Sequence, residues 1–191
     1  MKVTAFNGSP RKDGNTDFII RYVFKELEKE GIETEMVQLA GKKIRGCISC
    51  YKCMKNKDRR CAIDNDIINK CIKKILESDG IILGSPSYFS NVTAEMKALI
   101  DRAGLVAKVN GDIFKRKVGV AVASAGREGG VNVCDSINRF FLTNEMIVPG
   151  SNASNFGIGL QKGEVQNDQE GLLTIKTLGE NMAWLLKKVH W

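Results

Sequence analysis

Four cysteines lie close together in this sequence of 191 residues, at Cys47, Cys50, Cys53 and Cys61. The first three follow one another at gaps of two residues, so a loop that wraps around one small object can bring all three thiols to it. The interval of seven residues before Cys61 adds a fourth thiol after a short excursion of the chain. Four thiolates in one loop are suited to binding a metal ion or an iron–sulfur cluster.

The spacing of these cysteines favours a cluster over a zinc ion. Two successive gaps of two residues resemble the compact cysteine run by which ferredoxins ligate a four-iron cluster. Zinc sites more often contain two C-x2-C pairs with a longer spacer between them, and a redox dithiol needs only one C-x-x-C pair. Zinc and thiols without a metal stay open as alternatives, and the long last interval leaves Cys61 the least constrained of the four.

The same stretch is rich in cations, which are Lys52, Lys55, Lys57, Arg59 and Arg60. A four-iron centre bound by four thiolates is an anion, so surrounding cations would favour its reduced form. These side chains are equally typical of a solvated loop. The other two cysteines are predicted to pack in the core, because Cys71 shares a helix face with three isoleucines and Cys134 lies near the start of a helix.

A second group of polar residues lies at positions 8–16, between a strand-like run and a helical pattern. A turn in this place presents free backbone N–H groups and the positive end of a helix dipole, which suits a phosphate. Ser9, Asn15 and Thr16 add side-chain donors, and Arg11 adds a forked cation. The loop matches neither the Walker A nor the G-x-G-x-x-G pattern, which disfavours ATP and Rossmann-type NAD sites. A capped helix after a polar turn is the alternative.

Two more loops carry residues that could face a ligand. Pro86 cannot continue a strand, so the chain turns at residues 87–91, where Tyr88 and Phe89 offer aromatic surface for a flat ring or cover the end of the core. Glycines at positions 126, 129 and 130 allow the backbone to approach a ligand closely, or form a flexible turn.

These loops need a scaffold of alternating strands and helices. Strand-like runs are predicted at residues 2–7, 33–39, 81–84, 117–123 and 147–148. The first helix begins at Asn15 or Thr16 and ends at Gly31, and others are predicted at about 65–77, 92–107, 131–143 and 168–189. Five strands interleaved with helices predict an α/β fold with a doubly wound parallel sheet. Residues 1–191 are expected to form one domain, with a Cys-rich insertion at about 40–65 after the second strand and an irregular stretch at 150–167.

The three loops together resemble the flavodoxin-like NAD(P)H-dependent FMN reductases. The matching segments are Gly8–Arg11 with Asn15-Thr16, then Gly84–Asn91 followed by Lys97, Asp101 and Arg102, and then Ala123–Gly130. With the cysteine run, the sequence resembles the iron–sulfur flavoproteins, a branch of that family that carries a [4Fe–4S] cluster.

The resemblance implies the strand order 2-1-3-4-5 and the cofactors FMN and a [4Fe–4S] cluster. The cluster ligands would be Cys47, Cys50, Cys53 and Cys61. The residues that it implies for FMN are Ser9, Arg11, Asn15, Thr16, Pro86, Ser87, Tyr88, Phe89, Ser90, Asn91, Ser124, Gly126 and Gly129. It further implies a homodimer or homotetramer. No role is assigned to residues 150–167 from the sequence, and in an oligomer they could cover the flavin of a neighbour.

Composition and charge limit the possible functions. The net charge is +7, and the apolar runs are too short for a signal peptide or a membrane span, so a cytoplasmic protein with reduced thiols is expected. The single histidine is His190, the penultimate residue, so no catalysis by a positioned imidazole is expected. No motif for binding nucleic acid is present, and the basic charge suits an acidic electron donor.

The function expected is a flavin-dependent oxidoreductase without catalytic side chains of its own. It would pass electrons from a ferredoxin-type donor through the cluster and FMN to a small acceptor. One alternative is an NAD(P)H-dependent FMN or quinone reductase with structural cysteines. Another is a flavodoxin-like carrier or redox sensor that is not an enzyme.

Overall fold

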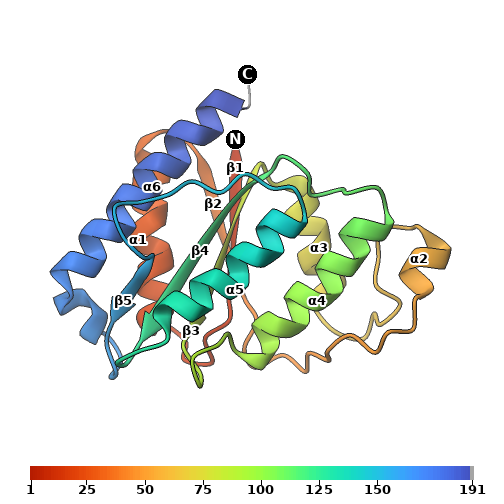
Figure 1. Cartoon of the computed structure of the whole chain (residues 1–191), viewed down its shortest axis with the longest axis horizontal. Coiled ribbons are helices and arrows are strands. Elements are labelled where there is room, and N and C mark those ends of the chain that lie inside the picture. The colour runs from red at the N-terminus through yellow and green to blue at the C-terminus, as the bar shows by residue number, and fades with distance from the viewer. Residues whose placement is uncertain (190–191) are drawn as a thin grey trace.

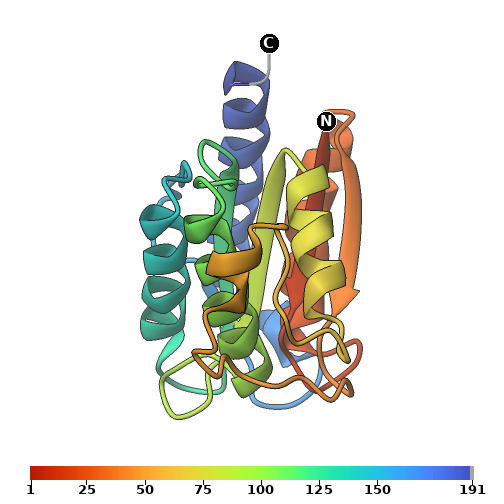
Figure 2. The ribbon, with the colours of Figure 1, turned by 90° about the vertical axis from the view of Figure 1, so that its right-hand side faces the viewer.

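A computed structural model describes residues 1–189, and His190 lies outside them. Five parallel strands form one sheet in the order β2-β1-β3-β4-β5, with helices on both faces (Figures 1 and 2). The strands are β1 (Lys2–Asn7), β2 (Glu33–Gln38), β3 (Gly80–Pro86), β4 (Val118–Ala125) and β5 (Phe156–Ile158). The helices are α1 (Asn15–Lys29), α2 (Lys52–Asn56), α3 (Ile68–Glu77), α4 (Ala94–Val109), α5 (Gly130–Thr143), the short 3-10 helix η1 (Glu164–Asn167) and α6 (Gln169–Val189). The predicted flavodoxin-like fold and strand order are confirmed.

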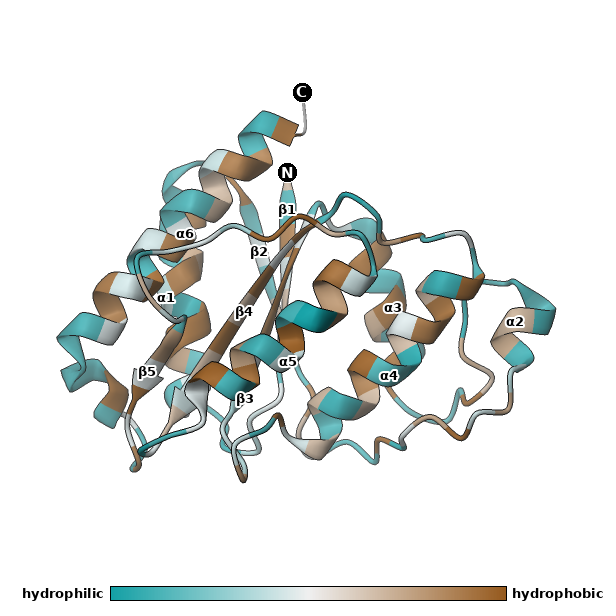
Figure 3. Ribbon diagram, in the orientation of Figure 1, coloured by the Kyte–Doolittle hydropathy of each residue, from teal (hydrophilic) through white to brown (hydrophobic). Residues whose placement is uncertain are grey.

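The central strands are apolar along their length because both of their faces are covered (Figure 3). Successive side chains of a strand point to opposite faces, and the core divides accordingly. Ile81 and Leu83 of β3 pack in the layer under α3, α4 and α5, whereas Ile82 packs in the layer under α1 and α6. The sheet is thereby fixed between two helical layers, and its loops are held at defined positions.

Cys71 and Cys134 are buried in the layer under α3, α4 and α5, as predicted. Burial raises the pKa of each thiol to about 12. Both therefore stay protonated and act as small apolar side chains.

The prediction of the last strand at residues 147–148 is wrong. Ile147 makes a single bridge to Val118, at the start of β4, and the chain then leaves the sheet at Pro149. It returns as β5, which pairs with the other end of β4 from Ala123 to Ala125. Pro149 has no N–H group to donate to a neighbouring strand. The two apolar residues before it, Ile147 and Val148, therefore cannot continue as a strand along this edge of the sheet. Part of the stretch predicted to be irregular is therefore the fifth strand.

The Cys-rich insertion departs from the sheet and runs beside α4, where it contains the five-residue helix α2 (Figures 1 and 2). Tyr51 and Lys57, which flank α2, both have left-handed backbone conformations, with φ of 53° and 52°. These turns confine α2 to little more than one turn. Among residues 1–189, no helix has the length and apolar character needed to cross a membrane.

Candidate functional site

A cleft lies at the carboxyl ends of β1, β3 and β4, at the lower edge of the sheet in Figure 1. This edge contains the point where the strand order reverses, which is the usual ligand position in such sheets. Eight of the thirteen residues predicted to bind FMN line the cleft together with two that were not predicted. The lining residues are Ser9, Arg11, Asn15, Pro86, Ser87, Tyr88, Ser124, Gly126, Gly159 and Leu160.

The loop after β1 is fixed by hydrogen bonds among its own polar groups. Asn7 Oδ1 accepts a hydrogen bond from Ser9 N–H at 2.9 Å, and Ser9 Oγ accepts one from Arg11 N–H at 3.2 Å. The first turn of α1 has no side-chain cap, so its N–H groups are available to an anion. The amide Nδ2 of Asn7 is buried without a hydrogen-bond partner among the described residues. The first turn of α1 and the amide of Asn7 thus leave hydrogen-bond donors without an internal partner at this loop.

Asn15 lines the cleft, and its amide binds the segment after β5. Its Nδ2 donates to the carbonyls of Gly159 and Gln161 at 2.8 and 2.9 Å, and its Oδ1 accepts from Gly163 N–H at 2.8 Å. Arg11 Nη1 also donates to the carbonyl of Leu160, at 2.9 Å. Residues 159–163 therefore close one side of the cleft of their own chain.

Thr16 does not line the cleft. It is buried, and its hydroxyl is 2.8 Å from that of Ser124, which joins the start of α1 to the end of β4. The two residues missed in the sequence, Gly159 and Leu160, follow the misplaced fifth strand. A Cβ on Gly159 would lie 2.5 Å from the backbone nitrogen of Val165. This close approach explains why a glycine is required at position 159. The glycine itself was the sequence signal that could have indicated a tightly packed loop here.

The loop after β3 forms a tight turn. Tyr88 and Asn91 exchange backbone hydrogen bonds of 2.9 and 3.1 Å, and Phe89 and Ser90 between them have positive φ values of 48° and 58°. Tyr88 is half exposed and borders the cleft, whereas Phe89 is fully exposed and neither lines the cleft nor covers the core. Asn91 Oδ1 accepts from Val92 N–H just before α4.

Gly129 joins this turn to the loop after β4. Its φ is 84°, and a Cβ at this position would lie 2.3 Å from Ser87 Oγ and 2.7 Å from Ser90 Cα. The two loops are thus packed directly against each other. Neither Gly129 nor Ser90 lines the cleft itself.

The four clustered cysteines line a second cavity, between the insertion and α4. Its other lining residues are Ile48, Tyr51, Ala62, Ile63, Arg102, Leu105 and Val106. Cys53 is buried, Cys61 is partly buried, and Cys47 and Cys50 are exposed. Burial raises the pKa of Cys53, and the nearby thiols of Cys61 and Cys50 add to this effect. Within residues 1–189, no three histidine, cysteine or acidic side chains are placed closely enough to hold a single metal ion.

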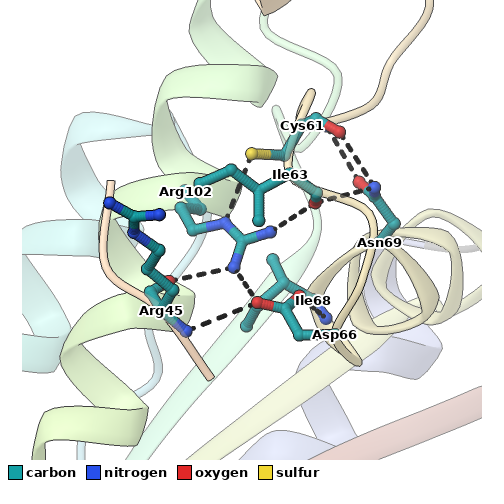
Figure 4. Close-up of polar contacts among 7 residues, drawn as sticks. All are labelled: Arg45, Cys61, Ile63, Asp66, Ile68, Asn69 and Arg102. Carbon is teal, nitrogen blue, oxygen red and sulfur yellow. Dashed lines mark hydrogen bonds and ion pairs between the residues drawn. The ribbon is translucent and has the colours of Figure 1, made fainter. Parts of the chain in front are cut away.

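Arg102 is the polar centre of this region (Figure 4). Its Nε donates to Cys61 Sγ at 3.2 Å, and its Nη2 donates to the carbonyl of Ile63 at 2.7 Å. Its Nη1 donates to the carbonyl of Arg45 at 2.9 Å and forms an ion pair with Asp66. The sequence resemblance groups Arg102 with the flavin loops, but its contacts lie in the cysteine insertion.

Asp66 is fixed from two sides. Burial opposes its ionisation, but the hydrogen bond from Arg102 and the N–H of Ile68, at 3.0 Å, outweigh this effect and lower its pKa. The carboxylate therefore stays charged beside the guanidinium. Lys97 and Asp101, which belong to the same resemblance, form an exposed ion pair on α4.

The two cavities lie at different levels of α4. The loop after β1 contacts the start of this helix, where Thr93 Oγ1 donates to the carbonyl of Gly8 at 3.0 Å. The cysteine cavity contacts α4 from Arg102 to Val106. At about 1.5 Å per residue, Thr93 and Leu105 are about 18 Å apart along the helix.

Comparison with known proteins agrees with this arrangement. A family model described as NADPH-dependent FMN reductase matches residues 1–161. An iron–sulfur flavoprotein of Methanocaldococcus jannaschii is 40% identical, with 99% of each chain covered. The iron–sulfur flavoprotein of Methanosarcina thermophila is 33% identical, with 100% of this chain and 97% of the relative covered.

Solved structures share the fold at low sequence identity. RosB with bound 8-demethyl-8-formylriboflavin-5'-phosphate has a TM-score of 0.81 and 20% identity, with 99% of this chain and 80% of RosB covered. A flavodoxin from the domain Archaea has a TM-score of 0.62 and 17% identity, with 98% of this chain and 99% of the flavodoxin covered.

Proposed function

The chain belongs to the NADPH-dependent FMN reductase family and, within it, to the iron–sulfur flavoproteins, and on this premise we propose that it passes electrons through a [4Fe–4S] cluster and FMN to a small acceptor. It is a flavin-dependent oxidoreductase with a flavodoxin-like fold. The observation that carries the proposal is the convergence of four cysteines on one cavity, in a chain that has a separate cleft at the flavin position of the fold.

The cleft suits FMN by its donors and its shape. The phosphate would be held by Ser9, by Arg11 and by the uncapped first turn of α1, where the helix dipole favours an anion. Asn15 and Thr16 would support this loop through their contacts with residues 159–163 and with Ser124. Bound FMN would supply the exchange of one or two electrons with donor and acceptor.

The loops after β3 and β4 would hold the flavin ring. Pro86, Ser87 and Tyr88 line the cleft on one side, and Ser124 and Gly126 line it on the other. Phe89, Ser90, Asn91 and Gly129 would shape these loops from outside the cleft. The residues of the chain would therefore orient the ring and limit its contact with water.

The cysteine cavity suits a cluster better than a single ion. With Zn–S bonds of about 2.3 Å, four tetrahedral thiolates lie about 3.8 Å from one another. In a four-iron cluster each thiolate binds a different iron, so the sulfurs lie farther apart. The four cysteines that line this one cavity follow a spacing that resembles the cluster-binding run of ferredoxins, which supports this second arrangement. Ile48, Leu105 and Val106 would limit access of solvent to the cluster.

We place the cluster in the insertion at about residues 40–65 of a single domain, and propose that electrons cross between subunits. The two cavities lie at different levels of α4, and a homodimer or homotetramer could bring the cluster of one copy near the flavin of another. The exposed basic residues of the insertion suit a ferredoxin-type donor with an acidic surface.

Iron and acid-labile sulfide analysis of anaerobically purified protein tests the cluster. We expect about four of each per chain, and a loss of most of both in Cys53→Ser. Cys134→Ala is the matched control, because this buried cysteine lies outside the cavity and should leave the iron content unchanged. Wild-type protein without iron and sulfide would refute the cluster.

The family description supports a second candidate, direct reduction of the flavin by NADPH. Stopped-flow mixing of the anaerobic holoprotein with NADPH separates the two. Rapid bleaching of the flavin absorbance without a ferredoxin would favour the reductase, whereas bleaching that requires a reduced ferredoxin would favour the proposed electron path.

A further inference from the structure

We propose that Arg102 is a positioning residue for the cluster, which orients Cys61 as its fourth ligand and raises the reduction potential of the site. The inference rests on the proposed function, since it concerns the cysteine cavity. It starts from the observation that a guanidinium on α4 reaches the sulfur of the cysteine that the sequence spacing constrains least.

The burial of Arg102 needs an explanation. Its side chain is 0% exposed, and burying a cation is costly unless it is paired and hydrogen-bonded. Asp66, itself 1% exposed, supplies the opposite charge. Two backbone carbonyls and one sulfur complete the environment of the guanidinium (Figure 4).

The partners of Arg102 come from both ends of the insertion. Arg45 precedes the first cysteine of the cluster motif, whereas Ile63 and Asp66 follow the last one. One side chain therefore fastens the beginning and the end of the cysteine loop to α4. The plane of the guanidinium is fixed by these contacts, so its Nε–H is directed at Cys61.

The backbone of Cys61 is held independently by Asn69 of α3. Cys61 N–H donates to Asn69 Oδ1 at 2.8 Å, and Asn69 Nδ2 donates to the Cys61 carbonyl at 2.9 Å. With Arg102 on its sulfur, Cys61 is held by two helices. This anchoring offsets the freedom that the seven-residue interval would otherwise give it.

The contact has its greatest effect when the sulfur is an anion. A neutral thiol is a weak hydrogen-bond acceptor, whereas a bond from a cation to an anion is short and strong. Nε donates to the sulfur of Cys61, and Asp66 binds Nη1 on another arm of the guanidinium. The positive charge of Arg102 is therefore nearer to the sulfur than the negative charge of Asp66 is. A cation on a ligand sulfur stabilises an added electron, which raises the potential. The electron comes from the one-electron donor, and no bond forms or breaks.

The test compares variants that separate the hydrogen bond from the charge. Arg102→Lys keeps a cation beside Asp66 but cannot bridge the sulfur and the carboxylate as a fork. Arg102→Gln combined with Asp66→Asn removes both charges, so neither is left buried alone. Asp66→Asn alone keeps the contact with Cys61. Arg45→Gln is the matched control, because it removes a positive charge from the same loop while the contacts of Arg45 to this network are made by its main chain.

The readouts are iron content and the midpoint potential of the cluster, followed by electron paramagnetic resonance in a redox titration. For Arg102→Lys and for the double variant we expect reduction to be less favourable by about tenfold in its equilibrium constant, which is about 59 mV for one electron. Asp66→Asn should raise the potential, and Arg45→Gln should shift it by less than about twofold in the same constant. Loss of iron from a folded Arg102 variant, with iron retained in Arg45→Gln, also supports the positioning role.

Two results would overturn the inference. One is an unchanged potential in both Arg102 variants, and the other is an equal shift in Arg45→Gln, which would indicate a general effect of charge. If Arg102→Lys does not fold, the double variant decides. Wild-type protein without iron would refute the proposed function itself, whereas loaded wild type with unshifted variants would refute only the role of Arg102.

Discussion

Arg11 is the residue whose substitution most directly tests the flavin cleft. It lines the cleft, and one of its N–H groups anchors Leu160. Arg11→Ala removes a charge-assisted hydrogen bond to the proposed phosphate, worth about 1.5–3 kcal/mol, so FMN should bind about 10- to 100-fold more weakly. Fluorescence titration of the apoprotein with FMN measures this dissociation constant.

Lys12 provides the control for Arg11. It is an exposed cation in the same loop, and it does not line the cleft. Lys12→Ala should change the dissociation constant by less than about threefold, because an exposed charge is largely screened. Equal effects of the two substitutions would show that the loop attracts FMN by general charge rather than through Arg11.

Residue types could be predicted from the sequence better than the contacts of each residue. Cysteine spacing and the polar turn after the first strand are local patterns, and both sets of residues line cavities. The contacts of Arg102 and Asn15 could not be predicted, because their side chains bind segments that are far away in the sequence. Arg102 reaches Arg45 across 57 residues, and Asn15 reaches Gly159 across 144. Such partners are set by packing, which no local pattern encodes.

At the scale of elements, the long helices and buried strands were predictable because their apolar periodicity is strong. β5 was not, because it has three residues, and the bridge of Ile147 to β4 imitates its beginning. The misplaced strand also affected the prediction of the site, because the segment that closes the cleft follows directly after β5. Residues 150–167 therefore had no assigned role within their own chain.

The contact between the loops after β3 and β4 predicts a strong effect at Gly129. Alanine there would adopt a left-handed conformation, which costs about 1–2 kcal/mol, and its Cβ would meet Ser87 and Ser90. Gly129→Ala should lower the free energy of unfolding by at least about 2 kcal/mol, measured by urea denaturation. Gly150→Ala is the control, because a Cβ at that position has no neighbour within 4 Å. Similar stability of both variants would contradict the packed arrangement of the loops.

The ion pair between Arg102 and Asp66 predicts a pH-dependent stability of the apoprotein. Removing one partner of a buried pair costs about 3–5 kcal/mol, so Asp66→Asn should be destabilised by about this amount at pH 7. The pKa of Asp66 is lowered in the folded state, so its stabilising contribution is complete above its ordinary pKa of about 3.9. The contribution is lost as the pH falls through the lower folded-state value.

The difference in unfolding free energy between wild type and Asp66→Asn should therefore be constant from neutral pH to about pH 5. It should shrink below about pH 4, where the Asp66 carboxylate of the unfolded wild type becomes protonated before that of the folded state. Urea denaturation across this range measures the difference. A gap that persists undiminished at pH 3 would assign the effect to packing rather than to the charge of Asp66.

At the scale of the whole molecule, the two cavities lie at different levels of α4, and positively charged side chains gather near one of them. The chain has a net charge of +7, and five exposed cations lie between Cys50 and Cys61 in the insertion. Basic residues at this end would attract an acidic donor protein to the cluster side rather than to the flavin cleft. The entry and exit of electrons would then be separated by the fold.

This separation predicts that electron transfer from a reduced, acidic ferredoxin depends on the charges of the insertion. The rate constant, followed by stopped flow, should fall by about tenfold or more between low and high ionic strength, because salt screens the steering. Lys52→Glu combined with Lys55→Glu should lower the low-salt rate by a similar factor and remove most of the salt dependence.

Lys25→Glu combined with Lys188→Glu makes the same change of net charge on α1 and α6, which lie on the other side of the molecule from α2 (Figure 1). This control should keep most of the rate, because steering depends on where the charge lies. Equal losses in the two pairs would mean that net charge alone attracts the donor, and the insertion would lose its assignment as the entry point.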